Sequence, residues 1–177
     1  MQGFFYLKTP EDLLHKLERE YEKVKQNPAD VDHAFNFFVT AEHLPDWLYN
    51  QDMPTSGIPR PDLLDNKRPG DFKNTHAVLR VCSHLANGGK HFHLDDPRHQ
   101  SIQRAVLENT RWVWSGWVDE DWVGEEPLLR VYLTPGEVAT LQGAGVPIAS
   151  EDIDARWLAT RVLEFWHNYW VSTGRIP

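Results

Sequence analysis

The sequence has few of the features that mark secreted or membrane-inserted proteins. Cys82 is the only cysteine, so the chain can form no intrachain disulfide, and a reducing compartment suits it. Residues 1–10 lack the basic start and the long apolar run of a signal peptide, and no later apolar run approaches the length of a membrane span. These absences predict a cytoplasmic protein outside the membrane.

Positive charge is also scarce. The chain has 18 Lys and Arg against 26 Asp and Glu, which gives a net charge of −8 with neutral histidines. Broad binding to a polyanion needs clustered cations, so this balance disfavours unspecific nucleic-acid binding but leaves room for a small basic pocket. The chain also contains no phosphate-loop or dinucleotide-binding glycine motif, which argues against kinases, P-loop enzymes and dinucleotide enzymes.

The remaining composition is that of one globular domain. The 177 residues are 41% hydrophobic and 25% charged, which is enough to bury a core. Eight tryptophans supply large apolar area for the core or for a contact surface. We therefore expect a single helical domain over residues 1–177.

Hydrophobic periodicity predicts four helices. The first covers residues 10–26, where a proline in the first turn and two following acids favour a helix start. The second runs from about residue 30 to residue 48, with a kink or a stop at Pro45, because the proline ring removes a backbone donor. The third covers residues 74–94, and the last begins at Ser150. This pattern indicates a mainly α fold with a four-helix bundle-like core.

A small antiparallel β insertion is expected before the last helix. Trp112 and Trp114 alternate with other residues as in a strand, and so do the apolar residues in 129–133. A short helix is expected over residues 135–142. The proline-rich residues 52–73 predict a long loop.

A polar stripe runs along the predicted third helix. At about 100° per residue its members share one side, whereas Cys82 falls on the apolar side and is expected in the core. Such a stripe is typical of an active site and equally of a solvated helix face. Its members are His76, Arg80, Ser83, Asn87, Lys90 and His91.

These residue types suit metal-independent RNA cleavage. That reaction needs an acid, a base and a cation for the charge that develops on the phosphate. His91 would act as acid or base, and Arg80 and Lys90 would hold the phosphate. Asn87 would orient the substrate, and His84 would lie in the same site. The hypothesis requires no cofactor, and its partner is RNA.

The second helix offers binding residues that would face this stripe. His43 and Asn36 lie on the side opposite the core phenylalanines, and Trp47 lies one helical turn beyond His43. We expect these three residues to line the opposite wall of a cleft.

Two other functions stay open. A metal site would need three or four converging ligands, for which His43, Asp46, His84, His91 and His93 are the candidates. A non-catalytic interaction module would instead bind a protein, or a second copy as a homodimer, through the tryptophans and the proline-rich loop.

Two stretches together resemble a poorly characterised family of small bacterial and phage-borne proteins. FNFFVTAEHLPDWL at 35–48 is similar to a family helix that ends in His-Leu-x-Asp-Trp, and LRVCSHLANGGKHFHL at 79–94 is similar to the helix that follows it. Residues 152–166 resemble its closing helix. The resemblance covers most of the chain and implies a link to phage or other mobile elements.

A more distant resemblance is to the HEPN superfamily of helical bundles. Its members are often dimeric, are common in toxin–antitoxin and antiphage defence systems, and include metal-independent ribonucleases with an Arg-x4-6-His motif. Arg80 and His84 have only three residues between them. Arg161 and His167 fit the spacing but lie about 120° apart on one helix. The resemblance therefore implies a fold and leaves the activity to the site itself.

Overall fold

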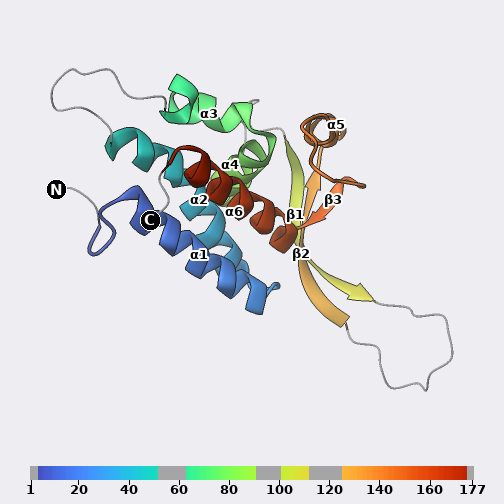
Figure 1. The fold of residues 1–177 in the computed structure, drawn as a ribbon. Coiled ribbons are helices and arrows are strands. Elements are labelled where there is room, and N and C mark those ends of the chain that lie inside the picture. The colour runs from blue at the N-terminus through green and yellow to red at the C-terminus, as the bar shows by residue number, and fades with distance from the viewer. Residues whose placement is uncertain (1–3, 52–62, 91–100, 112–124, 175–177) are drawn as a thin grey trace.

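The structure is a computed structural model that describes residues 4–51, 63–90, 101–111 and 125–174. Helices form one layer, and a three-stranded antiparallel sheet lies at one side of it (Figure 1). The fold is mainly α with a small β element before the last helix, as the sequence predicts. Within the described residues, no helix is both long and apolar enough to cross a membrane.

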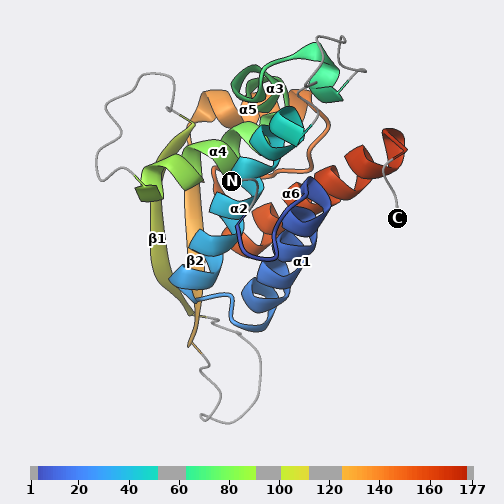
Figure 2. The same ribbon diagram turned by 90° about the vertical axis from the view of Figure 1, so that its left-hand side faces the viewer.

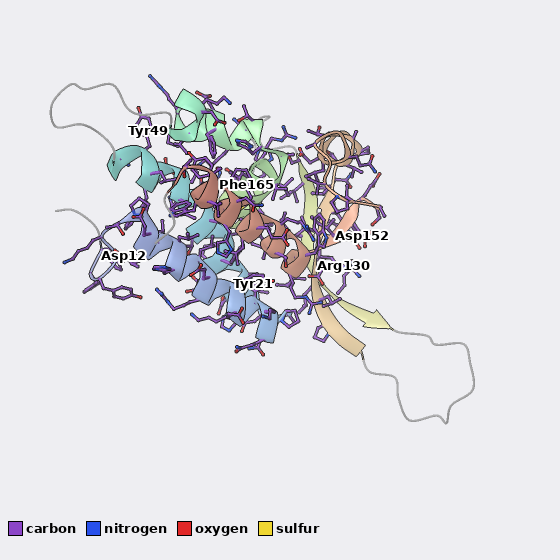
Figure 3. All side chains as sticks on the ribbon, viewed as in Figure 1. Asp12, Tyr21, Tyr49, Arg130, Asp152 and Phe165 are labelled. Carbon is purple, nitrogen blue, oxygen red and sulfur yellow. The ribbon has the colours of Figure 1, made fainter. Side chains whose placement is uncertain are left out.

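Helix α1 spans Pro10–Gln26, the range predicted from the sequence. Its start is fixed by a reciprocal cap in which Thr9 Oγ1 accepts from the Asp12 amide at 3.1 Å and Asp12 Oδ2 accepts from the Thr9 amide at 3.0 Å. The Lys8 amide also donates to Asp12 Oδ2, at 2.9 Å, and the hydrogen bonds from the Lys8 and Thr9 amides lower the pKa of Asp12. The Tyr21 hydroxyl lies 3.0 Å from Thr160 Oγ1 and joins α1 to the last helix (Figure 3).

Helix α2 spans Val31–Gln51 and continues through Pro45, so the helix does not stop there. Leu44 and Leu48 flank the proline and are fully buried. Burial of these side chains on both sides of Pro45 holds the two halves of α2 against the same core, which offsets the lost backbone bond.

The third predicted helix is two helices. Helix α3 spans Pro69–Thr75 and helix α4 spans Ala77–Lys90, and the extended backbone of His76 separates them. Helix α3 lies partly inside the segment that we expected to be a loop. Phe72 is fully buried and fixes α3 on the core, so a tertiary contact decides this element.

The sheet has the order β1-β2-β3, with β1 at Ile102–Arg111, β2 at Glu125–Leu133 and β3 at Asp152–Asp154. The strand expected around Trp112 and Trp114 falls outside the described residues. Strand β3 occupies part of the segment where we expected the last helix to begin.

The last two helices follow the sheet strands. Helix α5 spans Pro135–Gly143, close to the predicted range, and helix α6 spans Ala155–Ser172. The Asp154 side chain caps α6 through the Arg156 amide, so the start expected at Ser150 is wrong. Residues 152–154 are held in β3 by pairing with β2, which delays the helix.

The core contains a large aromatic cluster. Trp166 has no exposed surface and contacts the rings of its neighbours at centroid distances of 5.4 to 6.3 Å. Cys82 is buried, as predicted. We define the aromatic cluster as Phe72, Phe165, Trp166, Tyr169 and Trp170.

Candidate functional site

Arg80 lies on α4 and pairs with a carboxylate from α5. Its Nε donates to Glu137 Oε2 at 3.1 Å, and its Nη2 donates to Glu137 Oε1. The Ser101 hydroxyl donates to the same Glu137 Oε2 at 2.6 Å. Glu137 is buried, so this network neutralises a buried carboxylate and joins α4 to α5. The cation expected to hold a phosphate is therefore paired within the chain.

The other predicted catalytic residues lie along the same helix. His84 is 4% exposed, and Asn87 donates its side-chain amide to Ser83 Oγ at 3.3 Å. Lys90 is the last residue of α4, but its side chain and all of His91 lie outside the described residues. The structure thus places three of the five, of which Arg80 contacts α5 and His84 lines an apolar pocket.

His43 belongs to a different group of charges. Its Nδ1 lies 3.4 Å from Glu42 Oε2 and 3.9 Å from Asp46 Oδ2. The buried Lys73 ammonium hydrogen-bonds to Glu42 Oε1 and lies 3.7 Å from Asp46 Oδ2. We call these four residues the Glu42–Lys73 cluster.

The Glu42–Lys73 cluster has the spacing of a metal site but holds a cation of its own. Glu42, His43 and Asp46 can each offer a ligand atom within 4.8 Å of the others. Lys73 contacts both carboxylates, so its ammonium already supplies the positive charge that a metal ion would bring. Of the other histidines proposed as ligands, His84 lines the apolar pocket, and His91 and His93 lie outside the described residues.

The two other binding candidates on α2 lie in different surroundings. Asn36 is exposed, and its backbone carbonyl accepts a hydrogen bond from Thr40 Oγ1 at 2.6 Å. Trp47 is half-buried and packs against the core. The structure therefore does not bring Asn36 and Trp47 together as one wall of a cleft.

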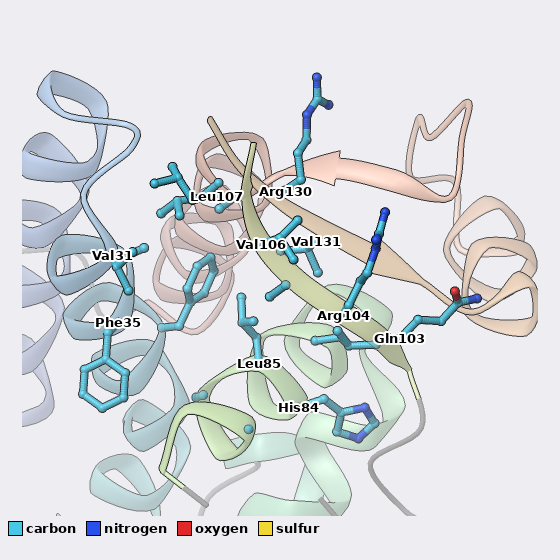
Figure 4. A pocket seen from close by; sticks show the side chains of 18 residues that line it. Val31, Phe35, His84, Leu85, Gln103, Arg104, Val106, Leu107, Arg130 and Val131 are labelled. Carbon is cyan, nitrogen blue, oxygen red and sulfur yellow. The ribbon is translucent and has the colours of Figure 1, made fainter. Parts of the chain in front are cut away.

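A pocket of about 410 Å³ lies between the start of α2, the second half of α4 and strands β1 and β2 (Figure 4). Its lining is largely aliphatic and aromatic, and the Arg104 and Arg130 side chains extend away from it. Apolar pockets of this size suit hydrophobic groups. The lining includes Val31, Phe35, His84, Leu85, Leu107 and Val131.

The strand register explains why this pocket is open. Ala105 pairs with Val131 and Leu107 pairs with Leu129, so these four side chains share the face of the sheet that faces the helices. Val131 is fully buried, whereas Ala105 and Leu107 are exposed. The helical layer thus covers Val131 on β2 but leaves Ala105 and Leu107 on β1 exposed.

Three large apolar side chains surround this opening. Val31 is 57% exposed, Phe35 is 41% exposed and Leu107 is 54% exposed. We call Val31, Phe35, Ala105 and Leu107 the apolar edge. Sequence patterns gave little warning of it, because Phe35 belongs to a run whose other phenylalanines are buried, and the alternation through Leu107 does not say which face is covered.

The opposite face of β1 is charged. The Arg104 guanidinium lies 3.9 Å from the centre of the Tyr132 ring, and the Tyr132 hydroxyl donates to Glu108 Oε1 at 2.7 Å. This hydrogen bond raises the pKa of Tyr132. Arg104 and Glu108 also lie 3.7 Å apart. Tyr132 therefore holds one cation and one anion four residues apart on the outer face of the edge strand.

Comparisons with family models, curated proteins and solved structures gave no match to this chain. The arrangement of its own side chains therefore carries the functional argument.

Proposed function

We propose that the chain is a non-catalytic protein-interaction module that binds through the apolar edge. The observation that carries the proposal is the exposure of Val31, Phe35 and Leu107 around an apolar pocket beside an edge strand. Contiguous apolar surface of this kind is unfavourable in water and marks contact sites, whereas scattered apolar residues do not.

The chemistry of the pocket favours a protein over a charged ligand. Aliphatic and aromatic side chains form most of the lining, and burial of apolar surface is worth roughly 25 cal/mol per Å². The edge strand adds backbone donors and acceptors, which bind extended polypeptide. A polypeptide partner could place apolar side chains in the pocket and pair its backbone with the edge strand. The pocket and the edge strand together therefore suit a protein partner.

The metal-independent ribonuclease has less support and stays a hypothesis. Glu137 takes two of the five guanidinium donors of Arg80 and neutralises its charge, which weakens the attraction of Arg80 for a phosphate. Cleavage of RNA in EDTA by the purified chain, lost in Arg80→Ala and in His91→Ala, would support it. The cytoplasmic location and the link to defence or mobile elements rest on sequence alone.

Photo-crosslinking tests the proposed surface. We place p-benzoylphenylalanine at Phe35, which is 41% exposed, and, as a control, at Val171 on α6, which is 58% exposed. Both proteins are irradiated in pure form and in cell extract. We expect one discrete adduct from position 35 that Leu107→Asp removes, and none from position 171. Equal crosslinking at the two positions, or none at position 35, would contradict the proposal.

A further inference from the structure

We propose that the occupant of the apolar edge is a second copy of this chain, with the two β1 strands paired antiparallel about Val106. The inference rests on the proposed interaction function and names its partner. It follows from the free edge of β1, from the charge order along this strand and from the apolar side chains on its inner face.

One edge of strand β1 is available for pairing with another strand. Strand β2 pairs along one side of it over Ile102–Arg111, and within the described residues no strand pairs along the other. Figure 2 shows β1 at the outer boundary of the ribbon. Alternate residues of such a strand direct their backbone N–H and C=O groups away from the sheet, where a second strand can bond to them.

Symmetry limits how two identical strands can pair. In an antiparallel pair, residues that lie opposite each other point to the same face. A two-fold axis therefore passes midway between one residue and the same residue of the second copy. Each choice of this central residue gives one register. The register shift between Ile102 and Arg104 restricts regular pairing to the strand beyond it.

The register centred on Val106 is complementary in charge. It places Arg104 opposite Glu108 of the second copy, and Glu108 opposite Arg104 of the second copy. Opposite charges at facing positions stabilise strand pairs. Because Tyr132 already contacts both groups, their side chains are held on the outer face before the second copy binds.

The neighbouring registers lack this match. An axis through Ala105 sets Arg104 opposite Val106, and an axis through Leu107 sets Glu108 opposite Val106. Each leaves the charged groups facing apolar or neutral side chains. Charge order therefore selects Val106 from among the central residues of β1.

The same register also serves the inner face. It sets the large Leu107 opposite the small Ala105 of the second copy, twice across the axis. The axis is perpendicular to the sheet, so both helical layers lie on one side. The exposed Val31 and Phe35 of each copy line the same pocket as Ala105 and Leu107 on that side. One pairing thus covers the free strand edge and the apolar edge together.

A mixing experiment tests the pairing through charge. Arg104→Glu carries two acids at the paired positions, and Glu108→Arg carries two bases. We expect the wild-type chain to sediment as a dimer and each variant to lose on the order of tenfold in dimer affinity. An equal mixture of the two variants should restore a dimer, because each facing pair is again opposite in charge.

Mixing separates this effect from the contact of Arg104 and Glu108 within one chain. In the mixture each chain still holds two like charges, so an intrachain role cannot be rescued. A wild-type chain that stays monomeric in sedimentation, or a mixture that stays as dissociated as the single variants, would overturn the proposed pairing.

A cysteine on the axis tests the register. Facing residues of antiparallel strands have Cα atoms about 4.5 to 5.5 Å apart, which a disulfide spans. We expect Val106→Cys to form a covalent dimer under mild oxidation. A cysteine at Gln103 would lie several residues along the strand from its copy, so Gln103→Cys should form no covalent dimer. The wild-type chain is a further control, because its one cysteine, Cys82, is buried. A covalent dimer from Gln103→Cys and none from Val106→Cys would overturn the register.

The photo-crosslinker at Phe35 distinguishes failure of this pairing from failure of the proposed function. A crosslink to a second copy in the pure protein supports both. A crosslink only to another protein in extract overturns self-pairing and keeps the interaction function. Absence of any adduct overturns both.

Discussion

The aromatic cluster and the apolar edge both contain large apolar residues, but the cluster is buried and the edge is exposed. Phe72 and Trp166 in the cluster are fully buried, whereas Phe35 and Leu107 at the edge are among the most exposed large apolar side chains. Hydrophobicity alone therefore does not decide which residues form the core. The neighbouring elements decide it, because each apolar face needs another element to cover it.

The difference lies in what surrounds each region. Helix α3 lies over the aromatic cluster, and the Leu64 amide donates to the Tyr169 hydroxyl at 2.8 Å. Strand β1 extends past the helices, and within the described residues only β2 pairs with it. The cluster is covered by elements of its own chain, whereas the edge is exposed in the single chain.

Truncation at the two regions should give the largest contrast. Trp166→Ala removes a fully buried indole and leaves a cavity, so we expect a loss of about 4 kcal/mol in the free energy of unfolding. Phe35→Ala should change this free energy several-fold less, because its ring is partly in water. Urea unfolding at low protein concentration measures both. Equal losses would contradict the distinction between a closed core and an open edge.

The Glu42–Lys73 cluster gives the next largest effect. Lys73→Ala leaves the buried Glu42 carboxylate without its cation, and we expect a loss of about 3 kcal/mol in the free energy of unfolding. The matched double variant Glu42→Gln with Lys73→Met removes both charges and should recover part of the loss.

Lys73→Ala also tests whether the Lys73 ammonium excludes a metal ion from this position. In Lys73→Ala the carboxylates of Glu42 and Asp46 lie beside His43 without the ammonium, so Zn²⁺ should raise the melting temperature. Zn²⁺ should leave the wild-type melting temperature unchanged. An equal response in the two proteins would show that Lys73 does not exclude the ion.

His76 should give a smaller effect that depends on pH. Its ring lies between Phe72 and Phe165 at centroid distances of 4.5 and 4.8 Å, and burial lowers its pKa from 6.5 although Asp65 opposes the shift. The unfolded chain therefore binds a proton at His76 more readily than the folded chain does. The contribution of His76 to the free energy of unfolding is fully present above pH 6.5 and is lost as the pH falls below 6.5.

The measurement compares the wild-type chain with His76→Gln by urea unfolding between pH 7.5 and 5. Carboxylate titration contributes to both proteins, so the difference between their curves isolates His76. A difference that grows as the pH falls is expected, with the wild-type chain losing more. A constant difference would show that His76 stays unprotonated in both states or titrates equally in them.

Local signals predicted the elements that local chemistry controls. The Thr9 and Asp12 cap and Pro10 fixed the start of α1, and Pro135 marked the start of α5. The errors lie where distant contacts compete. Strand β3 delays α6 because residues 152–154 pair with β2, and this pairing is invisible to periodicity.

The candidate site was harder to predict for the same reason. The helical spacing of Arg80 and His84 was correct, but spacing does not reveal that Glu137, 57 residues away, bonds the guanidinium. Phe35 lies in the same run as the buried Phe37 and Phe38, and its exposure depends on the packing of α2 against the rest of the fold. Sequence patterns supplied the chemical groups, and tertiary contacts decided which of them stay accessible.

The smallest expected change in stability is at the apolar edge itself. Leu107→Asn should alter the free energy of unfolding of the dissociated chain by less than about 0.5 kcal/mol, because the side chain is largely in water. It should nevertheless weaken association strongly, since Leu107 would lie beside the two-fold axis. Val171→Asn, at a similarly exposed site on α6, should leave both quantities unchanged.

Urea unfolding and sedimentation of the same samples separate the effect on folding from the effect on association. A residue that matters for association and little for folding belongs to a binding surface. If Leu107→Asn instead destabilised the monomer as much as a core truncation does, the edge would be part of the folded core.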